Sequence, residues 1–334
     1  MEKRKLDIKD SSICLIVAFF ISQIAIIFTQ LITSAILTAV KDSAYDVANF
    51  FNKPSGYLIT VLAQFAVFVG VFIYYKKKTT LTNELTKDKI NVKSLILFLI
   101  IGIITLFSLN YFVNYYSLIL NLFDKPISTI PYSIDKWSTY IITSISLAVL
   151  PAIGEELIFR GVIYNGLKSK GKLFAVLLSS CMFALFHFSL SQLYYPLFFG
   201  IILGFAMALT NNIYVCILVH FLNNFLNISI QFFFKTSLLH INALTITALI
   251  VGVLIYIAIL SFLFYKLYKK EKTEQKIAIK ENQETPKQTL LIRKNKASVK
   301  NYSFKAIFQH EKFWFYFPLI VMFALYIIIA VLGA

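Results

Sequence analysis

Charged residues are scarce in this chain, and acidic ones most of all. Only 14% of its 334 residues are charged and 58% are hydrophobic, with a mean hydropathy of +0.75. One soluble core cannot enclose so much apolar surface, so the composition excludes a single soluble domain and predicts a polytopic membrane protein. The sequence also lacks internal repeats, a glycine-rich phosphate loop and a soluble catalytic domain. Any chemistry must therefore be performed by residues in the helices.

Cysteine is also rare, and its positions exclude two further kinds of site. Cys14, Cys181 and Cys216 all lie within apolar runs and lack metal-type spacing. We interpret them as buried packing residues, which leaves neither a disulfide framework nor a thiolate site. Gly200 and Gly204 form a small-xxx-small pair, which we likewise assign to close helix packing.

Long apolar segments are abundant. Those long enough to span a bilayer lie at about 13–40, 56–75, 94–120, 138–153, 173–190, 196–210, 213–234, 242–265 and 313–333. The first is far longer than a signal-peptide core and has no small-residue cleavage site, so we expect it to be retained. The predicted fold is all-α, a polytopic integral membrane protein.

Most of the 32 lysines and arginines gather in alternate connections between these runs. The rich connections are the N-terminus, 76–93, 154–172 and 266–312, and the poor ones are 41–55, 121–137 and 235–241. Because basic loops stay on the cytosolic side, we expect a cytosolic N-terminus, the Glu155–Arg160 stretch at the cytosolic end of its helix, and an external C-terminus. Topology thus explains the net charge of +16, and we expect membrane lipids as partners and no nucleic acid.

The stretch LPAIGEELIFRG contains the only two acids between Asp135 and Glu271. An ionised carboxylate is costly to remove from water unless it is paired, so acids within a membrane are usually functional. On a helix Glu156 and Arg160 are i and i+4 and can pair on one face, while Glu155 is rotated by about 100° and stays free. The alternative interpretation is a structural ion pair at the membrane interface with a snorkelling neighbour.

Two histidines downstream extend this polar set. His187 follows Phe183 by four residues, and His220 precedes Asn224 by four, so each pair shares a helical face. Imidazole can hold or deprotonate a water near neutral pH, and His220 with Asn224 could aim two donors at an oxyanion. The alternative is structural: His187 as a hydrogen-bonded core residue, and His220, Asn224 and Asn223 as links between helices.

Residue types alone also permit a metal site. Glu155, His187 and His220 would supply a two-histidine, one-carboxylate zinc set with an open position for water. However, the HExxH motif is absent, and no two histidines share a helical turn. His240 lies in an expected external loop and His310 just before the last run, so we assign neither a role.

The three polar segments together resemble the CPBP family of intramembrane proteases, also called the Abi or type II CAAX-protease family. The family pattern is a double glutamate with an arginine four residues on, then FxxxH, then HxxxN; it stands here as EELIFR, FALFH and HFLNN. The resemblance covers roughly residues 138–230, and no motif residue is missing. It implies an eight-helix bundle with a cytosol-facing cavity inside the membrane, to which the last run would add a ninth, C-terminal transmembrane helix.

The resemblance also implies a role for each motif residue. It assigns four catalytic residues, Glu155, His187, His220 and Asn224, and two supporting ones, Glu156 and Arg160. The first two would activate the attacking water, the next two would stabilise the tetrahedral oxyanion, and the supporting pair would set the electrostatics of the site. The family is often labelled metalloprotease, yet a metal-free glutamate mechanism also fits. We expect a metal-independent mechanism, with a divalent metal such as zinc as the alternative.

Six segments follow from the runs and the resemblance. They are a cytosolic N-terminus (1–12), three N-terminal transmembrane helices (13–137), a CPBP-like catalytic core (138–235), an eighth span (236–266), a basic cytosolic linker (267–312) and a C-terminal transmembrane helix (313–334). The linker has few large apolar residues and no helical stripe. We therefore expect it to be solvated and to rest on anionic lipid.

The predicted function is an intramembrane endopeptidase that cuts a hydrophobic or membrane-anchored peptide from the cytosolic side. The Lys-, Ile- and Asn-rich composition resembles that of a low-GC Gram-positive bacterium, where members of the family are associated with bacteriocin self-immunity, pheromone maturation and scaffolding. The alternative is a non-catalytic scaffold or immunity protein that binds a cell-envelope enzyme or peptide, which the extra span and its basic connection favour. A transporter or proton relay ranks last, because we find no inverted repeat.

Overall fold

The computed structural model describes residues 3–40, 47–122, 130–234 and 243–284, together with positions 320, 321 and 324. Apart from those three positions, the expected ninth helix at 313–333 lies outside the described residues. So do His240, His310 and the linker beyond Glu284.

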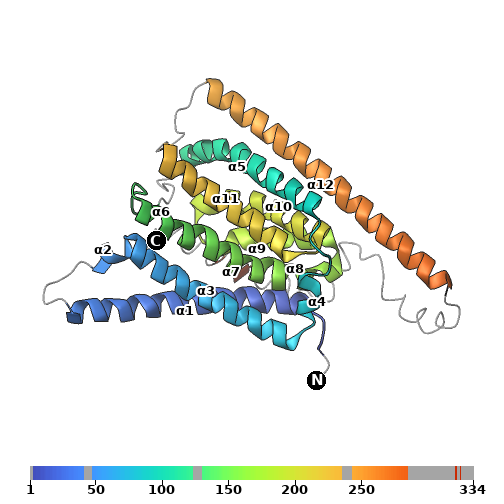
Figure 1. Cartoon of the computed structure of the whole chain (residues 1–334), viewed down its shortest axis with the longest axis horizontal. Helices are drawn as coiled ribbons and strands as arrows, with labels where there is room; N and C mark the ends of the chain where they lie inside the picture. Colours follow the sequence, from blue (N-terminus) through green and yellow to red (C-terminus); the bar gives the residue numbers. More distant parts are fainter. Residues whose placement is uncertain are drawn as a thin grey trace.

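The described chain is all-α, as predicted, and its long helices run back and forth through one bundle (Figure 1). They are α1 (Ile8–Val40), α3 (Pro54–Lys78), α5 (Val92–Asn121), a continuous helical rod from Trp137 to Lys170, α9 (Lys172–Phe186), α10 (Tyr194–Thr210), α11 (Ile213–Phe234) and α12 (Ala243–Glu284), with the short α2 (Val47–Phe51) and α4 (Leu81–Leu85) between them. Within the described ranges, 7 helices are long and apolar enough to cross a membrane, and α9 is a shorter apolar helix. The chain is therefore a polytopic membrane protein.

Each expected run up to 242–265 corresponds to one helix, but the fourth run was placed too short. The helix expected to stop at residue 153 continues as the rod to Lys170. Pro151 does not break it at the start of α7 (Leu150–Glu156), where proline leaves the carbonyl of Leu147 without its i+4 backbone donor; that carbonyl accepts from the Asn224 side chain at 2.9 Å. Glu155–Arg160 therefore lies in the middle of a helix, and our placement of it at a helix end was wrong.

Helix α12 also runs past its expected end. We expected a solvated linker from residue 267, but the helix continues beyond that point to its end at Glu284. This part is rich in lysine, glutamate and glutamine, which are strong helix formers. Lys270 donates to the last carbonyls of α10 at 2.8 and 3.3 Å, and Glu274 pairs with Lys172 of α9. The first turns of the extension are thus docked on the bundle.

The second half of the rod forms the centre of the bundle. All side chains from Ile158 to Leu167 are buried, with α1, α3, α9 and α11 packed around them. Next to it, α10 packs closely on α9: a Cβ at Gly204 would lie 3.2 Å from the Cα of Val176. The expected close packing at Gly204 is therefore confirmed, because glycine is the residue that allows the two backbones to approach this far.

The outer surfaces of the bundle are apolar. Ile24 and Phe28 of α1 and Leu254 of α12 are among the large apolar side chains that the bundle leaves exposed. In a bilayer such faces meet lipid, where apolar side chains carry no penalty. Cys181 is also exposed, on α9, so our interpretation of all three cysteines as buried is wrong for this one.

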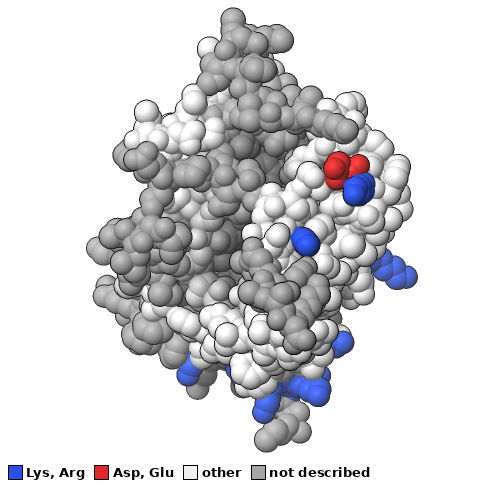
Figure 2. Space-filling model, turned by 90° about the vertical axis from the view of Figure 1, so that its left-hand side faces the viewer, with Lys and Arg blue, Asp and Glu red and all other residues white. Residues whose placement is uncertain are grey.

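One end of the bundle collects polar contacts between helices. Glu84 of α4 pairs with Lys168 at the end of the rod, and the pair between α9 and α12 lies at the same end. The N-terminal residues reach this end too, where the backbone N–H of Thr80 donates to the carbonyl of Arg4 at 3.0 Å. The opposite end faces the viewer in Figure 2 and shows only a few charged side chains among the residues drawn in colour or white.

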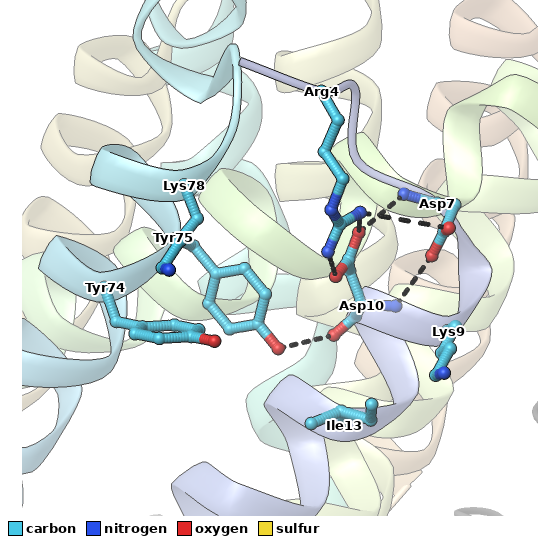
Figure 3. A pocket seen from close by; sticks show the side chains of 8 residues that line it. All are labelled: Arg4, Asp7, Lys9, Asp10, Ile13, Tyr74, Tyr75 and Lys78. Atoms are coloured by element: carbon cyan, nitrogen blue, oxygen red, sulfur yellow. Dashed lines mark hydrogen bonds and ion pairs between the residues drawn. The ribbon is translucent and has the colours of Figure 1, made fainter. Parts of the chain in front are cut away.

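The segment before α1 is bound to the first turn of α1, which is bound in turn to the end of α3 (Figure 3). The two guanidinium Nη atoms of Arg4 each lie 2.6 Å from a carboxylate oxygen of Asp10, and the Tyr75 hydroxyl donates to the Asp10 carbonyl at 3.2 Å. This bond to Asp10 raises the pKa of Arg4. With Lys78 and Tyr74 these groups line a cleft of about 400 Å³. No residue of the rod lines this cleft, so it is separate from the motif residues named in the sequence analysis.

Helix α1 then crosses the rod at very short range. The Ser11 hydroxyl donates to the carbonyl of Ile163 at 2.9 Å. A Cβ at Gly166 would lie 2.1 Å from the Ser11 Oγ and 2.4 Å from the carbonyl oxygen of Asp7. Backbone cannot yield as a flexible side chain can, so the crossing requires glycine at this position.

Replacing that glycine tests the crossing. We expect Gly166→Ala to lower the free energy of unfolding by roughly 1–3 kcal/mol, because the added methyl group must displace α1. Gly70→Ala is the matched control, since a Cβ there would meet nothing within 4 Å. The measurement is thermal unfolding of both variants in detergent. Equal stability of the two variants would contradict the close crossing.

The Glu84–Lys168 pair predicts a pH dependence of stability. Burial alone would raise the pKa of Glu84, but the hydrogen bond and charge of Lys168 outweigh it and leave the pKa below its ordinary value of 4.5. A depressed folded-state pKa contributes stability above the unfolded pKa, and that contribution is lost as the pH falls through the folded value.

Glu84→Gln should therefore unfold more easily than wild type at pH 7, by up to about 1 kcal/mol, with the difference shrinking as the solution is acidified below about pH 4. Asp135→Asn, at an exposed position, is the control and should change little at either pH. If the difference in stability between Glu84→Gln and wild type grew on acidification, the stabilising role of the Glu84–Lys168 pair would be contradicted.

Candidate active site

The rod owes its irregular centre to two π-helical segments, η1 (Ile145–Val149) and η2 (Leu157–Ile163), on either side of α7. A π-helical turn disturbs the regular i→i−4 bonding, so carbonyls in and beside it are open to other donors, and such turns are frequent at functional sites. Here side chains supply those donors. Asn165 Nδ2 reaches the carbonyls of Arg160 and Gly161 at 3.0 and 2.8 Å, and Ser11 reaches Ile163. The two motif glutamates are thus held between two widened turns.

Glu156 and Arg160 form a completely buried ion pair. The Glu156 Oε1 lies 2.9 Å from the Arg160 Nη1, and both side chains are 0% exposed. The guanidinium also donates through Nη2 to the carbonyl of Gly200 at 3.0 Å and lies 4.8 Å from the centroid of the Phe183 ring. A Cβ at Gly200 would lie 3.2 Å from the Phe183 ring and 3.3 Å from the Ser180 Cβ, so glycine allows α10 to approach α9 closely beside the arginine. The i, i+4 pairing on one face is as the sequence predicts.

His220 joins this pair from α11. Its Nδ1 lies 2.8 Å from the same Oε1 of Glu156. A carboxylate paired with arginine only accepts, so Nδ1 of His220 carries a proton and donates it. The other ring nitrogen, Nε2, faces Glu155 Oε2 at 3.8 Å, which is longer than a hydrogen bond. His220 is therefore oriented by one glutamate and presents its second nitrogen toward the other.

The two adjacent glutamates differ in access. The side chain of Glu155 is 14% exposed, whereas that of Glu156 is 0% exposed. Glu155 has no arginine partner, and within the described parts of the chain His220 is the basic side chain that faces it. The division expected from the sequence, one acid held and one left accessible, matches this geometry.

His187 lies at the C-cap of α9 and not, as expected, inside a helix reaching residue 190, because α9 ends at Phe186. Phe188 follows in the left-handed region with φ of 47°, which turns the chain away. The Nδ1 of His187 lies 2.9 Å from the carbonyl oxygen of Phe183. Since a carbonyl only accepts, Nδ1 carries the proton, and in the neutral ring Nε2 keeps a lone pair. His187 thus presents a potential base.

The Phe183 ring lies between the two histidines. Its centroid is 4.9 Å from that of His187 and 6.0 Å from that of His220, and both contacts are edge-on. The same ring supports the Arg160 guanidinium. The sequence offered Phe183 only as a motif position, and its role as the shared wall of the site appears only in three dimensions.

Asn224 is tied to the first π-helical segment. Its Nδ2 donates to the carbonyl of Leu147 at 2.9 Å, and its Oδ1 accepts from Asn223 at 3.2 Å. Asn223 in turn accepts from the Tyr195 hydroxyl at 2.8 Å. Asn223 does link helices, as the structural alternative expected, but through this bond it also contacts a motif residue. Tyr195 was not singled out from the sequence at all.

The candidate metal ligands do not form a metal-type cluster. Across the described residues there is no group of three His, Cys, Asp or Glu side chains placed to hold a metal ion. His220 donates from Nδ1 to Glu156 and His187 from Nδ1 to Phe183, which leaves Nε2 of each ring free, as it also is in metal-binding histidines. The placement of Glu155, His187 and His220 is nevertheless not that of a three-ligand zinc centre, and no chemical step below passes through a metal.

Comparison with family models identifies this region. Residues 137–226 match a model described as type II CAAX prenyl endopeptidase Rce1-like. This segment belongs to the CPBP/CAAX-protease family. The matched range starts at the first residue of the rod and includes every motif residue through Asn224. No curated protein and no solved structure gave a significant match to the chain.

The CAAX-protease match supports the general assignment of an intramembrane endopeptidase in a multi-pass membrane protein. The motif residues of this family stand on three elements of the structure, the rod, the end of α9 and α11. Helices α1, α3, α5 (Val92–Asn121) and α12 lie outside the matched range and surround or adjoin it.

The buried ion pair can be tested by removing one charge and then both. Arg160→Met leaves the Glu156 carboxylate without its countercharge, so we expect a loss of about 3–5 kcal/mol in the free energy of unfolding. Glu156→Gln combined with Arg160→Met removes both charges and should recover much of that loss, because the amide oxygen can still accept from His220. Thermal unfolding in detergent compares the two. A double variant less stable than Arg160→Met alone would contradict this account.

Proposed function

We propose that this protein is an intramembrane endopeptidase that hydrolyses a peptide bond in a membrane-associated peptide or protein. Its catalytic residues are Glu155, His187, His220 and Asn224. The observation that carries the proposal is the asymmetry of the two glutamates. Arg160 and His220 both bind Glu156, which leaves Glu155 as the accessible carboxylate facing the second nitrogen of His220.

In the proposed reaction a water molecule attacks the carbonyl carbon of the scissile peptide bond. Glu155, assisted by Nε2 of His187, takes one proton from that water as the C–O bond forms. The carbonyl oxygen becomes an oxyanion, and an Nε2–H of His220 and one N–H of Asn224 stabilise it. When the tetrahedral intermediate collapses, the C–N bond breaks and Glu155 returns its proton to the leaving amine. Atoms and charge balance without a cofactor.

In this proposal Glu156 and Arg160 do not contact the substrate but orient His220. Glu156 fixes the ring of His220 through Nδ1, which aims Nε2 toward the reacting centre. Arg160 binds the Glu156 carboxylate and is itself bound to the Gly200 carbonyl of α10. The pair thereby makes His220 a prepositioned donor, and preorganised donors in a water-poor site are worth more than they are in water.

We further propose that the site opens toward the cytosol of a bacterial cell membrane, with the N-terminus on the same side. The support is the gathering of Arg4, Lys168, Lys172 and the basic extension of α12 at one end of the bundle. A hydrophobic or membrane-anchored peptide can approach such a site laterally from lipid. Membrane lipids and this peptide are the partners we propose.

The test is cleavage of a membrane-tethered peptide library by the purified protein in detergent. We expect product from wild type and a fall in kcat of about 100-fold or more for Glu155→Ala, His187→Ala and His220→Ala. Asp135→Asn is the control variant and should cleave like wild type. A parallel reaction with a chelator should proceed unchanged if the mechanism needs no metal.

Two results would contradict the proposal that this protein is an enzyme. One is Glu155→Ala cleaving as fast as wild type. The other is no product from folded wild type together with a cellular phenotype that survives Glu155→Ala. The latter result would favour a scaffold that binds a cell-envelope protein, and deletion of the chain from Glu271 onward should then abolish its function.

A further inference from the structure

A chain of three hydrogen bonds crosses the bundle from α10 to the rod. The Tyr195 hydroxyl lies 2.8 Å from Asn223 Oδ1, the Asn223 Nδ2 lies 3.2 Å from Asn224 Oδ1, and the Asn224 Nδ2 lies 2.9 Å from the carbonyl oxygen of Leu147. The carbonyl at its end lies within the π-helical η1, next to the turn that carries the glutamates. The series therefore connects the start of α10 with the catalytic rod through a motif residue.

The Leu147 carbonyl determines which atom donates and which accepts in each hydrogen bond of this series. The carbonyl of Leu147 can only accept, so Asn224 must turn its Nδ2 toward it and its Oδ1 away. That Oδ1 can only accept, so Asn223 must present its own Nδ2 and turn its Oδ1 toward α10. The Tyr195 hydroxyl is then the donor that Asn223 Oδ1 needs. Each amide is held in one orientation out of two.

This order matters because Asn224 has two N–H groups. Leu147 takes one of them, and the other is left for a substrate oxygen. If Asn224 turned its amide over, it would place an acceptor where a donor is required. A carbonyl and a phenol at the two ends of the series prevent that turn.

We propose that Tyr195 and Asn223 are positioning residues that hold the amide of Asn224 in its donating orientation. This inference rests on the proposed function, in which Asn224 stabilises the oxyanion. The aromatic contacts of Tyr195 agree with it. Its ring stacks on Phe199 with centroids 6.0 Å apart, and the Phe199 ring meets the His220 ring at 5.7 Å. Tyr195 is thus connected to both donors of the oxyanion site.

Tyr195→Phe tests the proposal, and Tyr194→Phe is a matched control. The Tyr194 hydroxyl is buried without a hydrogen-bond partner among the described residues, so its removal should leave cleavage unchanged. Removing the Tyr195 hydroxyl should lower kcat roughly fivefold, the effect of one neutral hydrogen bond, with little change in KM. Equal kcat values for Tyr195→Phe and Tyr194→Phe, in a preparation whose wild type cleaves and whose Glu155→Ala variant does not, would overturn the positioning role and leave the enzyme intact.

A double-mutant cycle separates this role from general loss of structure. If Tyr195 acts through Asn224, Tyr195→Phe should have no further effect on kcat in an Asn224→Ala background. An undiminished fivefold effect in that background would overturn the proposal. Asn223→Asp should resemble or exceed Tyr195→Phe, because a carboxylate accepts from Tyr195 but cannot donate to Asn224.

A spectroscopic readout tests the hydrogen-bond series without relying on activity. With ¹⁵N-labelled asparagine, the side-chain amide signal of Asn224 should shift in Tyr195→Phe and stay unchanged in Tyr194→Phe. An unshifted Asn224 signal would overturn the series itself. A shifted signal in a protein whose wild type cleaves no peptide would instead count against the proposed function, because the series would then be structural.

Discussion

The rest of the site depends on one constraint, the burial of the Glu156 carboxylate and the Arg160 guanidinium in the middle of the bundle. Separating either charge from water costs several kcal/mol, so each must find compensation inside the protein. Three neighbouring elements provide it: α10 gives the Gly200 carbonyl, α9 gives the Phe183 ring, and α11 gives His220. The groups that contact the buried charges therefore also form the centre of the candidate site, although Glu156 Oε2 and Arg160 Nε have no hydrogen-bond partner among the described residues.

The irregular backbone of the rod also contains polar groups that need partners inside the protein. Within a membrane, non-regular backbone is tolerated only where protein or a water-filled cavity surrounds it, since lipid offers no hydrogen bonds. The second π-helical segment is buried from Ile158 onward, whereas the first buries Ser146 and Ala148 and leaves Ile145 exposed. Side chains of α1 and α11 bind one carbonyl in each segment. These bonds anchor the rod to its neighbours on both sides of α7, the segment that carries the two glutamates.

Much of this could be predicted from the sequence, because hydropathy and i, i+4 spacing are local properties. The eight helices up to α12 and the Glu156–Arg160 pair followed from them. The continuation of the rod past Glu156 did not, because charges in an apolar run usually mark a membrane boundary and the further partners of the ion pair lie on α10 and α11. Nor could the end of α9 before His187, or the hydrogen bond of Tyr195 to Asn223, be found locally. Both depend on neighbours that are distant in the chain.

The crossing of α1 over the rod has a consequence for biogenesis. Ser11 is synthesised 152 residues before its acceptor at Ile163, and Gly166 follows later still. Until then α1 and α3 must remain in the bilayer with this surface covered by lipid or by the insertion machinery. The Glu156 carboxylate can bind His220 only after α11 has been synthesised. Assembly of the charged centre is thus a late event, completed only when nearly all of the described bundle has been synthesised.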